Sequence, residues 1–403
     1  LQGQPTCYYC NYINTEKTNV AAKVINLMEY DAQTIGNHDI ETGHKVYDKY
    51  CLETNCDILA ANAIDTNSLK PYFKPYKMME IDGLRIAIIG MLTPTISHWL
   101  NEQLWSGMKF EGIPESMDKW TRHVREVEHA NIVIGLFHSG FEGGINDNGI
   151  RENQSIETAA NVAGIDLILC GHDHRLKKTT QTFGYTKKIN IINPSSNANY
   201  ISESTITANR TQSGWQLDGI ESNIVNVEDE TPDEEFLSHF TEDIEEVKKY
   251  VNRIIGTIEK SIFTKDSFFG PAPFSDFIHD VQMETTGADI SLNAPLQFDA
   301  CIKKGEIHVS DMFNLYTYEN QLYTIRMSGK EIHDLLEMSY RQWVDTMKSK
   351  DDHIMLMNQD NNGRYHWQNL AFNFDSAAGI DYEVDVTKEN GHKVKILRMS
   401  DGR

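Results

Sequence analysis

At 403 residues the chain is longer than one ordinary domain, and 40% hydrophobic, 10% aromatic and 24% charged residues are typical of a globular protein with a sizeable core. A formal net charge of −22 argues against a nucleic-acid polymer as a partner, because phosphate backbones are bound through Lys and Arg. No apolar run approaches the roughly 20 residues of a membrane span, and six cysteines are too few for a disulfide scaffold in a chain of this length.

The first half of the chain alternates predicted helices with short apolar strands. Residues before 15 are expected to form a loop, and apolar residues at helical spacing predict helices over 18–29 and 114–129. Runs of apolar, β-branched residues predict interior strands of an α/β domain. These strands are expected at 32–35, 58–62, 84–90, 132–137, 165–170 and 188–192.

Polar segments follow three of these strands, at the carboxyl ends where α/β proteins keep their chemistry. They are Gly36-Asn37-His38-Asp39-Ile40-Glu41, His138, and Gly171-His172-Asp173-His174. Imidazoles and an amide oxygen suit Zn, Mn or Fe better than Ca or Mg. Two rings on a Gly-His-x-His turn can point at two ions, and a pair of ions about 3.5–4 Å apart clamps both oxygens of a phosphoryl displacement. Each remaining histidine is more simply explained as a solvated or core imidazole.

The pattern changes after an acidic run at 228–230. The segment 231–234 predicts the capped start of a helix with one apolar stripe. An α+β pattern follows, with strands expected at 254–258, 288–292, 321–327 and 394–397, helices at 273–285, 310–315 and 330–340, and a loop at 345–363. We therefore predict a first domain over 1–227, a linker helix over 228–252 and a second domain over 253–403.

These motifs resemble the calcineurin-like metallophosphoesterases, and within them the 5′-nucleotidase and 2′,3′-cyclic-nucleotide 2′-phosphodiesterase family. The resemblance rests on the three polar segments, on Ala60-Ala61-Asn62, and on second-domain motifs at 287–290, 293, 305–307 and 328–331. It implies an α/β fold, namely a four-layer αββα metallophosphoesterase sandwich followed by a smaller α+β 5′-nucleotidase C-terminal domain that binds substrate.

The resemblance also implies roles for single residues. Asn37, His138 and His172 match the ligands of one metal ion, and His174 matches a ligand of a second. His38 matches the catalytic histidine that stabilises the transition-state phosphate and protonates the leaving oxygen, and Glu41 matches the carboxylate that orients it. The substrate-binding positions are matched by Tyr318, Asn293 and Asn320, with Tyr318 in place of the usual Phe.

The chain departs from the family pattern in two ways. The metal motifs Asp-x-His and Gly-Asp are missing, and the C-terminal Gly-rich segment with a second aromatic is also missing, so the chain is expected to be cut at both ends. The family's substrate-binding arginines are absent from 263–277 and from 293–298. The resemblance implies two divalent ions, Zn, Mn or similar, in the intact protein. We expect this chain to bind at most one ion, weakly, and to be poorly active.

The leading hypothesis is a metal-dependent phosphoesterase that hydrolyses nucleoside 5′-phosphates and/or 2′,3′-cyclic nucleotides through a metal-bound hydroxide. One alternative is a phosphatase for another small phosphate ester. A second is a non-catalytic binding protein that keeps the fold. The resemblance implies a periplasmic or extracellular location and a small-molecule phosphate ester as the partner. The sequence gives no indication of the oligomeric state.

Overall fold

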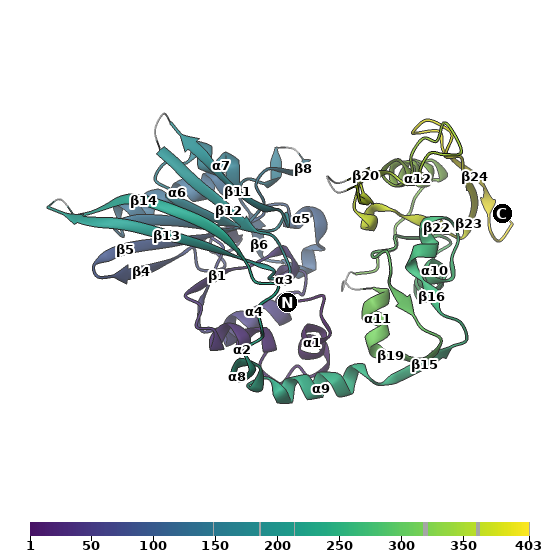
Figure 1. The fold of residues 1–403 in the computed structure, drawn as a ribbon, viewed down its shortest axis with the longest axis horizontal. Coiled ribbons are helices and arrows are strands. Elements are labelled where there is room, and N and C mark those ends of the chain that lie inside the picture. Colours follow the sequence, from purple (N-terminus) through teal and green to yellow (C-terminus); the bar gives the residue numbers. More distant parts are fainter. Residues whose placement is uncertain (148, 185–186, 213, 317–320, 360–362, 403) are drawn as a thin grey trace. The chain divides into compact units, whose positions relative to one another are not determined.

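The computed structural model describes residues 1–147, 149–184, 187–212, 214–316, 321–359 and 363–402 (Figure 1). It divides into one unit of Leu1–Gln2 with Thr6–Ile244 and a second of Gly3–Pro5 with Glu245–Arg403. The expected linker helix consists of two helices, α8 (Glu234–Ser238) and α9 (Thr241–Val251). Within the predicted start at 231–234, Asp233 caps α8 by accepting from the Phe236 N–H. The division between the units falls inside the predicted linker.

The first unit is built on a six-stranded sheet in the order β11-β12-β10-β7-β5-β4. Its strands are β4 (Tyr76–Ile81), β5 (Leu84–Leu92), β7 (Ile132–His138), β10 (Leu167–Cys170), β11 (Leu176–Phe183) and β12 (Lys187–Pro194). The four central strands are parallel, as expected for buried apolar runs, and the two outer ones are antiparallel. Helices α6 (Ile113–Glu126) and α7 (Ser155–Asn161) cover one face, where Ile89 and Met91 of β5 join the same core cluster.

A second layer of strands covers the other face. Gly90 lies between Ile89 and Met91 and therefore points the opposite way, against Leu59 of β2 (Asp57–Leu59), which pairs in parallel with β1 (Ala32–Thr34). The hairpin β13 (Tyr200–Thr211) and β14 (Gly214–Asn226) packs on this face too, since Asn190 of β12 donates to the Ile220 carbonyl at 2.9 Å.

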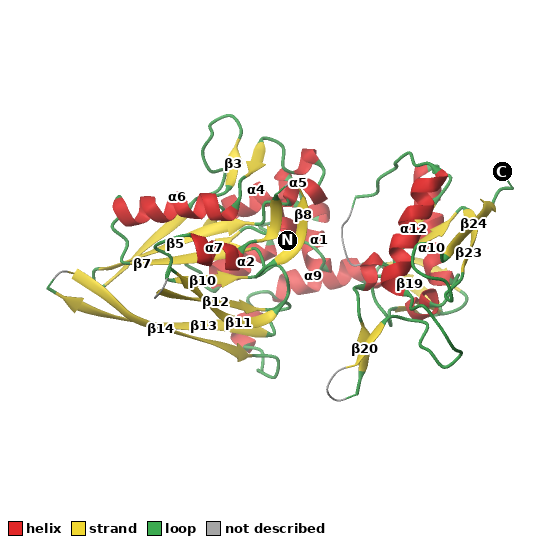
Figure 2. Cartoon of the chain, turned by 90° about the horizontal axis from the view of Figure 1, so that it is seen from above, coloured by secondary structure: helices red, strands yellow, loops and turns green. Residues whose placement is uncertain are grey.

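Helices α2 (Val20–Leu27) and α4 (His44–Glu53) form the outermost layer of the first unit. Ala22 of α2 and Tyr47 and Tyr50 of α4 cluster with Ile35, directly after β1, and with Ile58 of β2. The order from one side to the other is therefore helix, sheet, strands, helix, and the predicted four-layer αββα sandwich is confirmed. Figure 2 shows the hairpin β13–β14 beside β11 and β12 of the central sheet.

The remaining elements of this unit are short. They are α1 (Pro5–Tyr8), a π-helical turn (Tyr9–Ile13), α3 (Asn37–Ile40), β3 (Ala63–Asp65), α5 (Ile96–Trp99), a 3-10 turn (Glu102–Leu104), β6 (Met108–Phe110), β8 (Gly143–Asp147) and β9 (Ile150–Asn153). The prediction of a loop before residue 15 was wrong, because residues 5–13 are helical. The long β13–β14 hairpin was not predicted from the sequence.

The second unit is α+β, as predicted. Its helices are α10 (Pro273–Thr286), α11 (Val309–Leu315) and α12 (Gly329–Trp343), with 3-10 turns at Thr264–Phe268 and Ala371–Asn373. Its strands are β15 (Ile254–Ile258), β16 (Ile262–Phe263), β17 (Ser291–Asn293), β18 (Cys301–Ile302), β19 (Gly305–His308), β20 (Met357–Gln359), β21 (Tyr365–Trp367), β22 (Ser376–Ala378), β23 (Ile380–Val384) and β24 (Val394–Met399). Two predictions were wrong: residues 321–327 form no strand, and the expected loop at 345–363 contains β20. Within the described ranges, no helix is long and apolar enough to cross a bilayer.

Gly90 allows the two strand layers to meet, which makes its substitution a test of the sandwich. A Cβ at this position would lie 2.2 Å from the Leu59 Cβ and 2.7 Å from the Leu59 carbonyl carbon. Since the clash involves backbone, Gly90→Ala is expected to destabilise the first unit by about 1–3 kcal/mol, the usual cost of overpacking. Thermal unfolding should show a lower midpoint. The matched control is Gly219→Ala in β14, where a Cβ has no neighbour within 4 Å, and an equal loss in both variants would contradict the proposed packing.

Candidate metal centre

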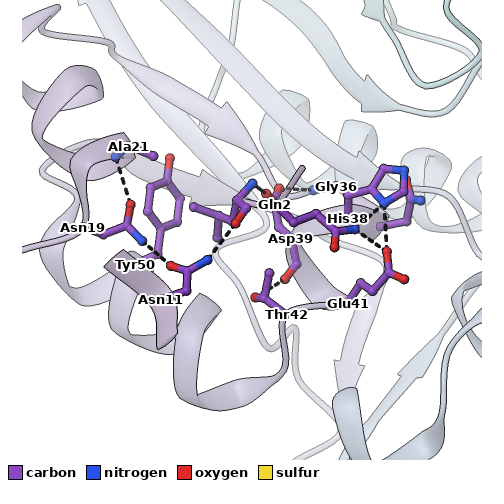
Figure 3. A network of polar contacts seen from close by, with 12 residues as sticks. Gln2, Asn11, Asn19, Ala21, Gly36, His38, Asp39, Glu41, Thr42 and Tyr50 are labelled. Carbon is purple, nitrogen blue, oxygen red and sulfur yellow. Dashed lines mark hydrogen bonds and ion pairs between the residues drawn. The ribbon is translucent and has the colours of Figure 1, made fainter. Parts of the chain in front are cut away.

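The first part of the site is the single turn α3, which follows β1 directly. Asp39 Oδ2 accepts the Gly36 N–H at 2.8 Å, and this contact fixes the start of the turn (Figure 3). A Cβ on Gly36 would lie 2.9 Å from His138 Cε1. Glycine therefore lets the ring of His138 approach the backbone, and the turn places the Asn37 side chain against that ring.

Three of the predicted ligands converge at the carboxyl ends of β1, β7 and β10. His138 Nε2 lies 2.8 Å from Asn37 Oδ1, and the rings of His138 and His172 lie with their centroids 5.0 Å apart. We call these three residues the Asn-His-His cluster. Burial, together with the neighbouring imidazole of His172, lowers the pKa of His138 to about 3, so its ring is neutral at physiological pH.

His172 is held from several sides. Its backbone φ of 77° is in the left-handed region, and its ring packs near those of His138 and Trp99, with the Trp99 ring centroid 5.6 Å away. His172 Nε2 lies 2.9 Å from Glu152 Oε1. Burial tends to raise the pKa of Glu152, but hydrogen bonds from His172 and from the Ile145 N–H hold it below its ordinary value. The sequence motifs did not single out Glu152.

Asp173 supports the loop that carries the two histidines. Its carboxylate accepts from the Phe141 N–H at 2.9 Å and from Asn193 Nδ2 at 2.6 Å. A Cβ on Gly140 would lie 2.3 Å from the same carboxylate. Asp173 therefore ties the loop after β10 to the loop after β7 and to β12. Its role in this structure is to position that loop.

His174 does not join the cluster. Its side chain is exposed, and the contacts that connect Asn37, His138 and His172 do not include its ring. In the described ranges, no three His, Cys, Asp or Glu side chains are close enough together to form a complete metal site. The structure therefore brings together three of the four predicted ligands.

The Asn-His-His cluster fits a divalent ion by its chemistry. An amide oxygen and neutral imidazoles are suitable donors for Zn, Mn or Fe. The 2.8 Å between Asn37 Oδ1 and His138 Nε2 is close to the roughly 3 Å that separates neighbouring ligands around a six-coordinate ion with bonds of about 2.1 Å. These residues would hold one ion.

His38 and Glu41 lie together, as the resemblance implies. His38 Nδ1 is 2.8 Å from Glu41 Oε2, and the side chain of His38 is 53% exposed while that of Glu41 is 13% exposed. Gln2 Nε2 lies 2.6 Å from the same His38 nitrogen and donates to Glu41 Oε2 (Figure 3). The largely buried carboxylate thus fixes the Nδ1 edge of the ring, while about half of the His38 side chain is exposed.

The predicted substrate residues lie in the second unit. Asn293 ends β17 and is buried, and its Nδ2 has no hydrogen-bond partner within the described part of the chain. Tyr318 and Asn320 lie outside the described residues.

Known proteins share this architecture. Residues 254–403 match the model of the 5′-nucleotidase C-terminal domain. The chain is 25% identical to a trifunctional nucleotide phosphoesterase of Bacillus subtilis over 100% of its length and 30% of that protein's. It is 24% identical to a 2′,3′-cyclic-nucleotide 2′-phosphodiesterase/3′-nucleotidase of Yersinia enterocolitica over 96% of its length and 65% of that protein's.

A solved structure matches almost the whole chain. A proposed 5′-nucleotidase of Staphylococcus aureus superposes with a TM-score of 0.78 at 20% identity, over 99% of this chain and 76% of that one. This likeness confirms the fold, and with the matches above it confirms the resemblance noted in the sequence. The chain spans 30% and 65% of the two curated relatives that it matches over almost its whole length.

Proposed function

We propose that this chain, a calcineurin-like relative of the 5′-nucleotidases whose C-terminal domain occupies residues 254–403, is part of a metal-dependent phosphoesterase. Its proposed substrates are nucleoside 5′-phosphates and/or 2′,3′-cyclic nucleotides. The observation that carries the proposal is the Asn-His-His cluster together with His38 and Glu41, all at the carboxyl ends of neighbouring strands. This is where open α/β sheets bind their ligands.

Each side chain has a proposed task. A divalent ion, when bound, polarises a phosphoryl oxygen and lowers the pKa of water. Asn37, His138 and His172 would hold that ion. His38 would contact the phosphate with the ring edge that faces away from Glu41 and donate a proton to the leaving oxygen. Glu41 would orient the ring of His38 through their 2.8 Å contact.

Several other predictions remain part of this proposal. We propose one ion in the Asn-His-His cluster, with His174 as a ligand of a second ion in the intact protein. The division at 1–227, 228–252 and 253–403 and an exported location are likewise proposed on the resemblance. Asn293, with its unpartnered buried amide, remains a candidate for substrate binding.

A substrate panel tests the function. The purified chain is assayed with Mn²⁺ or Zn²⁺ on a 5′-nucleotide, a 3′-nucleotide, a 2′,3′-cyclic nucleotide and simple non-nucleotide phosphate esters. We expect slow hydrolysis of the nucleotides that stops on chelation of the metal. Hydrolysis of only the non-nucleotide esters would favour the alternative phosphatase. No turnover by a chain with metal bound would favour a binding protein that keeps the fold.

A further inference from the structure

Glu152 lies in β9 beside the Asn-His-His cluster, and hydrogen bonds fix both its backbone and its carboxylate. Its backbone carbonyl accepts from Thr93 Oγ1 and from Ser139 Oγ, both at 3.0 Å. Thr93 and Ser139 are fully buried and follow β5 and β7, two neighbouring strands of the central sheet. The backbone of Glu152 is therefore fixed to the rigid part of the first unit.

The carboxylate of Glu152 is fixed as well. Oε2 accepts the Ile145 N–H of β8 at 2.7 Å, and Oε1 lies 2.9 Å from His172 Nε2. A Cβ on Gly144 would lie 2.2 Å from Oε2, and Gly144 has a φ of +76°. Because Gly144 has no Cβ, the carboxylate of Glu152 can occupy this space. One oxygen is anchored and the other is aimed at the histidine.

A hydrogen bond between a carboxylate and an imidazole nitrogen sets the tautomer of the ring. A neutral imidazole carries one N–H and one lone pair. If Nε2 carries the proton donated to Glu152, Nδ1 carries the lone pair and is the nitrogen free to bind a cation. Histidines that ligate metals usually donate their other N–H to an acceptor in this way, which fixes the orientation of the ring.

We infer that Glu152 is a positioning residue: it accepts the Nε2–H of His172 and so presents His172 Nδ1 to the ion in the Asn-His-His cluster. The inference rests on the proposed function, because it assumes that this cluster holds an ion. The rings of Trp99 and His138 pack near that of His172, and Glu152 restricts the rotation of the His172 ring and selects its tautomer.

The first test needs no metal. ¹⁵N NMR of the chain labelled at histidine, with His172 assigned from its loss in a His172→Asn variant, should show the Nε2–H tautomer for His172. In Glu152→Ala this preference should be lost. An unchanged tautomer in a folded Glu152→Ala chain would overturn the inference. If Glu152 only stabilised the fold, the tautomer of His172 would not depend on its carboxylate.

The second test is Mn²⁺ affinity, measured by EPR of the free ion. Glu152→Ala is expected to weaken binding by about 10–100-fold, as is usual for the partner of a metal-ligating histidine. Glu152→Gln keeps an acceptor oxygen and should lose less. Glu157→Gln is the matched control, because Glu157 pairs with Arg151 at 3.1 Å and should leave affinity unchanged. Wild-type affinity in both Glu152 variants would overturn the inference.

These tests separate the inference from the proposed function. A chain whose Mn²⁺ affinity and His172 tautomer depend on Glu152, but which hydrolyses no phosphate ester, would keep the inference and refute the function. Metal-dependent hydrolysis of phosphate esters, together with an unchanged His172 tautomer in Glu152→Ala, would keep the function and refute the inference. If the alanine variant does not fold, Glu152→Gln carries the test, and its Mn²⁺ affinity should still fall severalfold below that of the wild type and of Glu157→Gln.

Discussion

Replacing His138 with alanine is expected to lower the affinity of the chain for Mn²⁺ by at least about 100-fold, since even the outer partners of metal ligands contribute 10–100-fold. His138 is the centre of the Asn-His-His cluster, with Asn37 Oδ1 2.8 Å from its Nε2 and the ring of His172 beside it. Its buried, neutral ring is ready to bind a cation, because no proton has to be released first. Titration with Mn²⁺, followed by EPR or calorimetry, gives the affinity.

The control for this variant is His129→Asn. His129 is exposed at the turn after α6 and has a φ of 56°, which Asn tolerates well, so this variant should bind Mn²⁺ like the wild type. Thermal unfolding of both chains checks that His138→Ala is folded. A folded His138→Ala chain with wild-type affinity would show that the ion binds elsewhere.

Replacing His38 with alanine is expected to reduce kcat for phosphate-ester hydrolysis by about 10²–10⁴-fold, the usual contribution of a positioned general acid. Mn²⁺ affinity should fall far less than in His138→Ala, because the side chain of His38 contacts Glu41 and Gln2, whereas His138 contacts Asn37 and His172. Its half-exposed ring also makes a large loss of stability unexpected. The comparison of kcat with metal affinity therefore separates the proposed acid from the proposed ligands.

The same His129→Asn variant serves as the control for activity. A His38→Ala chain that keeps wild-type kcat would remove His38 from the proposed chemistry. A parallel loss of Mn²⁺ affinity would instead reassign His38 to the metal site.

Much of the first unit follows from the sequence for a simple physical reason. Buried parallel strands read as continuous apolar runs, and β5, β7 and β10 coincide closely with the predicted 84–90, 132–137 and 165–170. Because the polar segments each follow the carboxyl end of a predicted strand, a common site could also be predicted, although the separate sheet that β1 forms with β2 could not. The structure does place Asn37, His138 and His172 together.

Other features depend on contacts that the local sequence does not encode. A strand was predicted at 321–327, but an apolar segment does not by itself supply a hydrogen-bonding partner strand, and Leu322, Tyr323 and Ile325 are exposed there. Glu152 of β9 meets His172 through a contact between segments 20 residues apart, which no local pattern encodes. His172 and His174 both have positive φ, and the resulting turn places one side chain inward and leaves the other exposed, which the spacing of the motif does not reveal.

The most direct test of the account is the anomalous scattering of manganese in crystals of the chain soaked with Mn²⁺. We predict one peak bounded by Asn37 Oδ1, the ring of His138 and Nδ1 of His172, at ligand distances of about 2.1–2.3 Å. Absence of any peak among these three side chains at a saturating Mn²⁺ concentration would contradict the assignment of the Asn-His-His cluster as a metal centre.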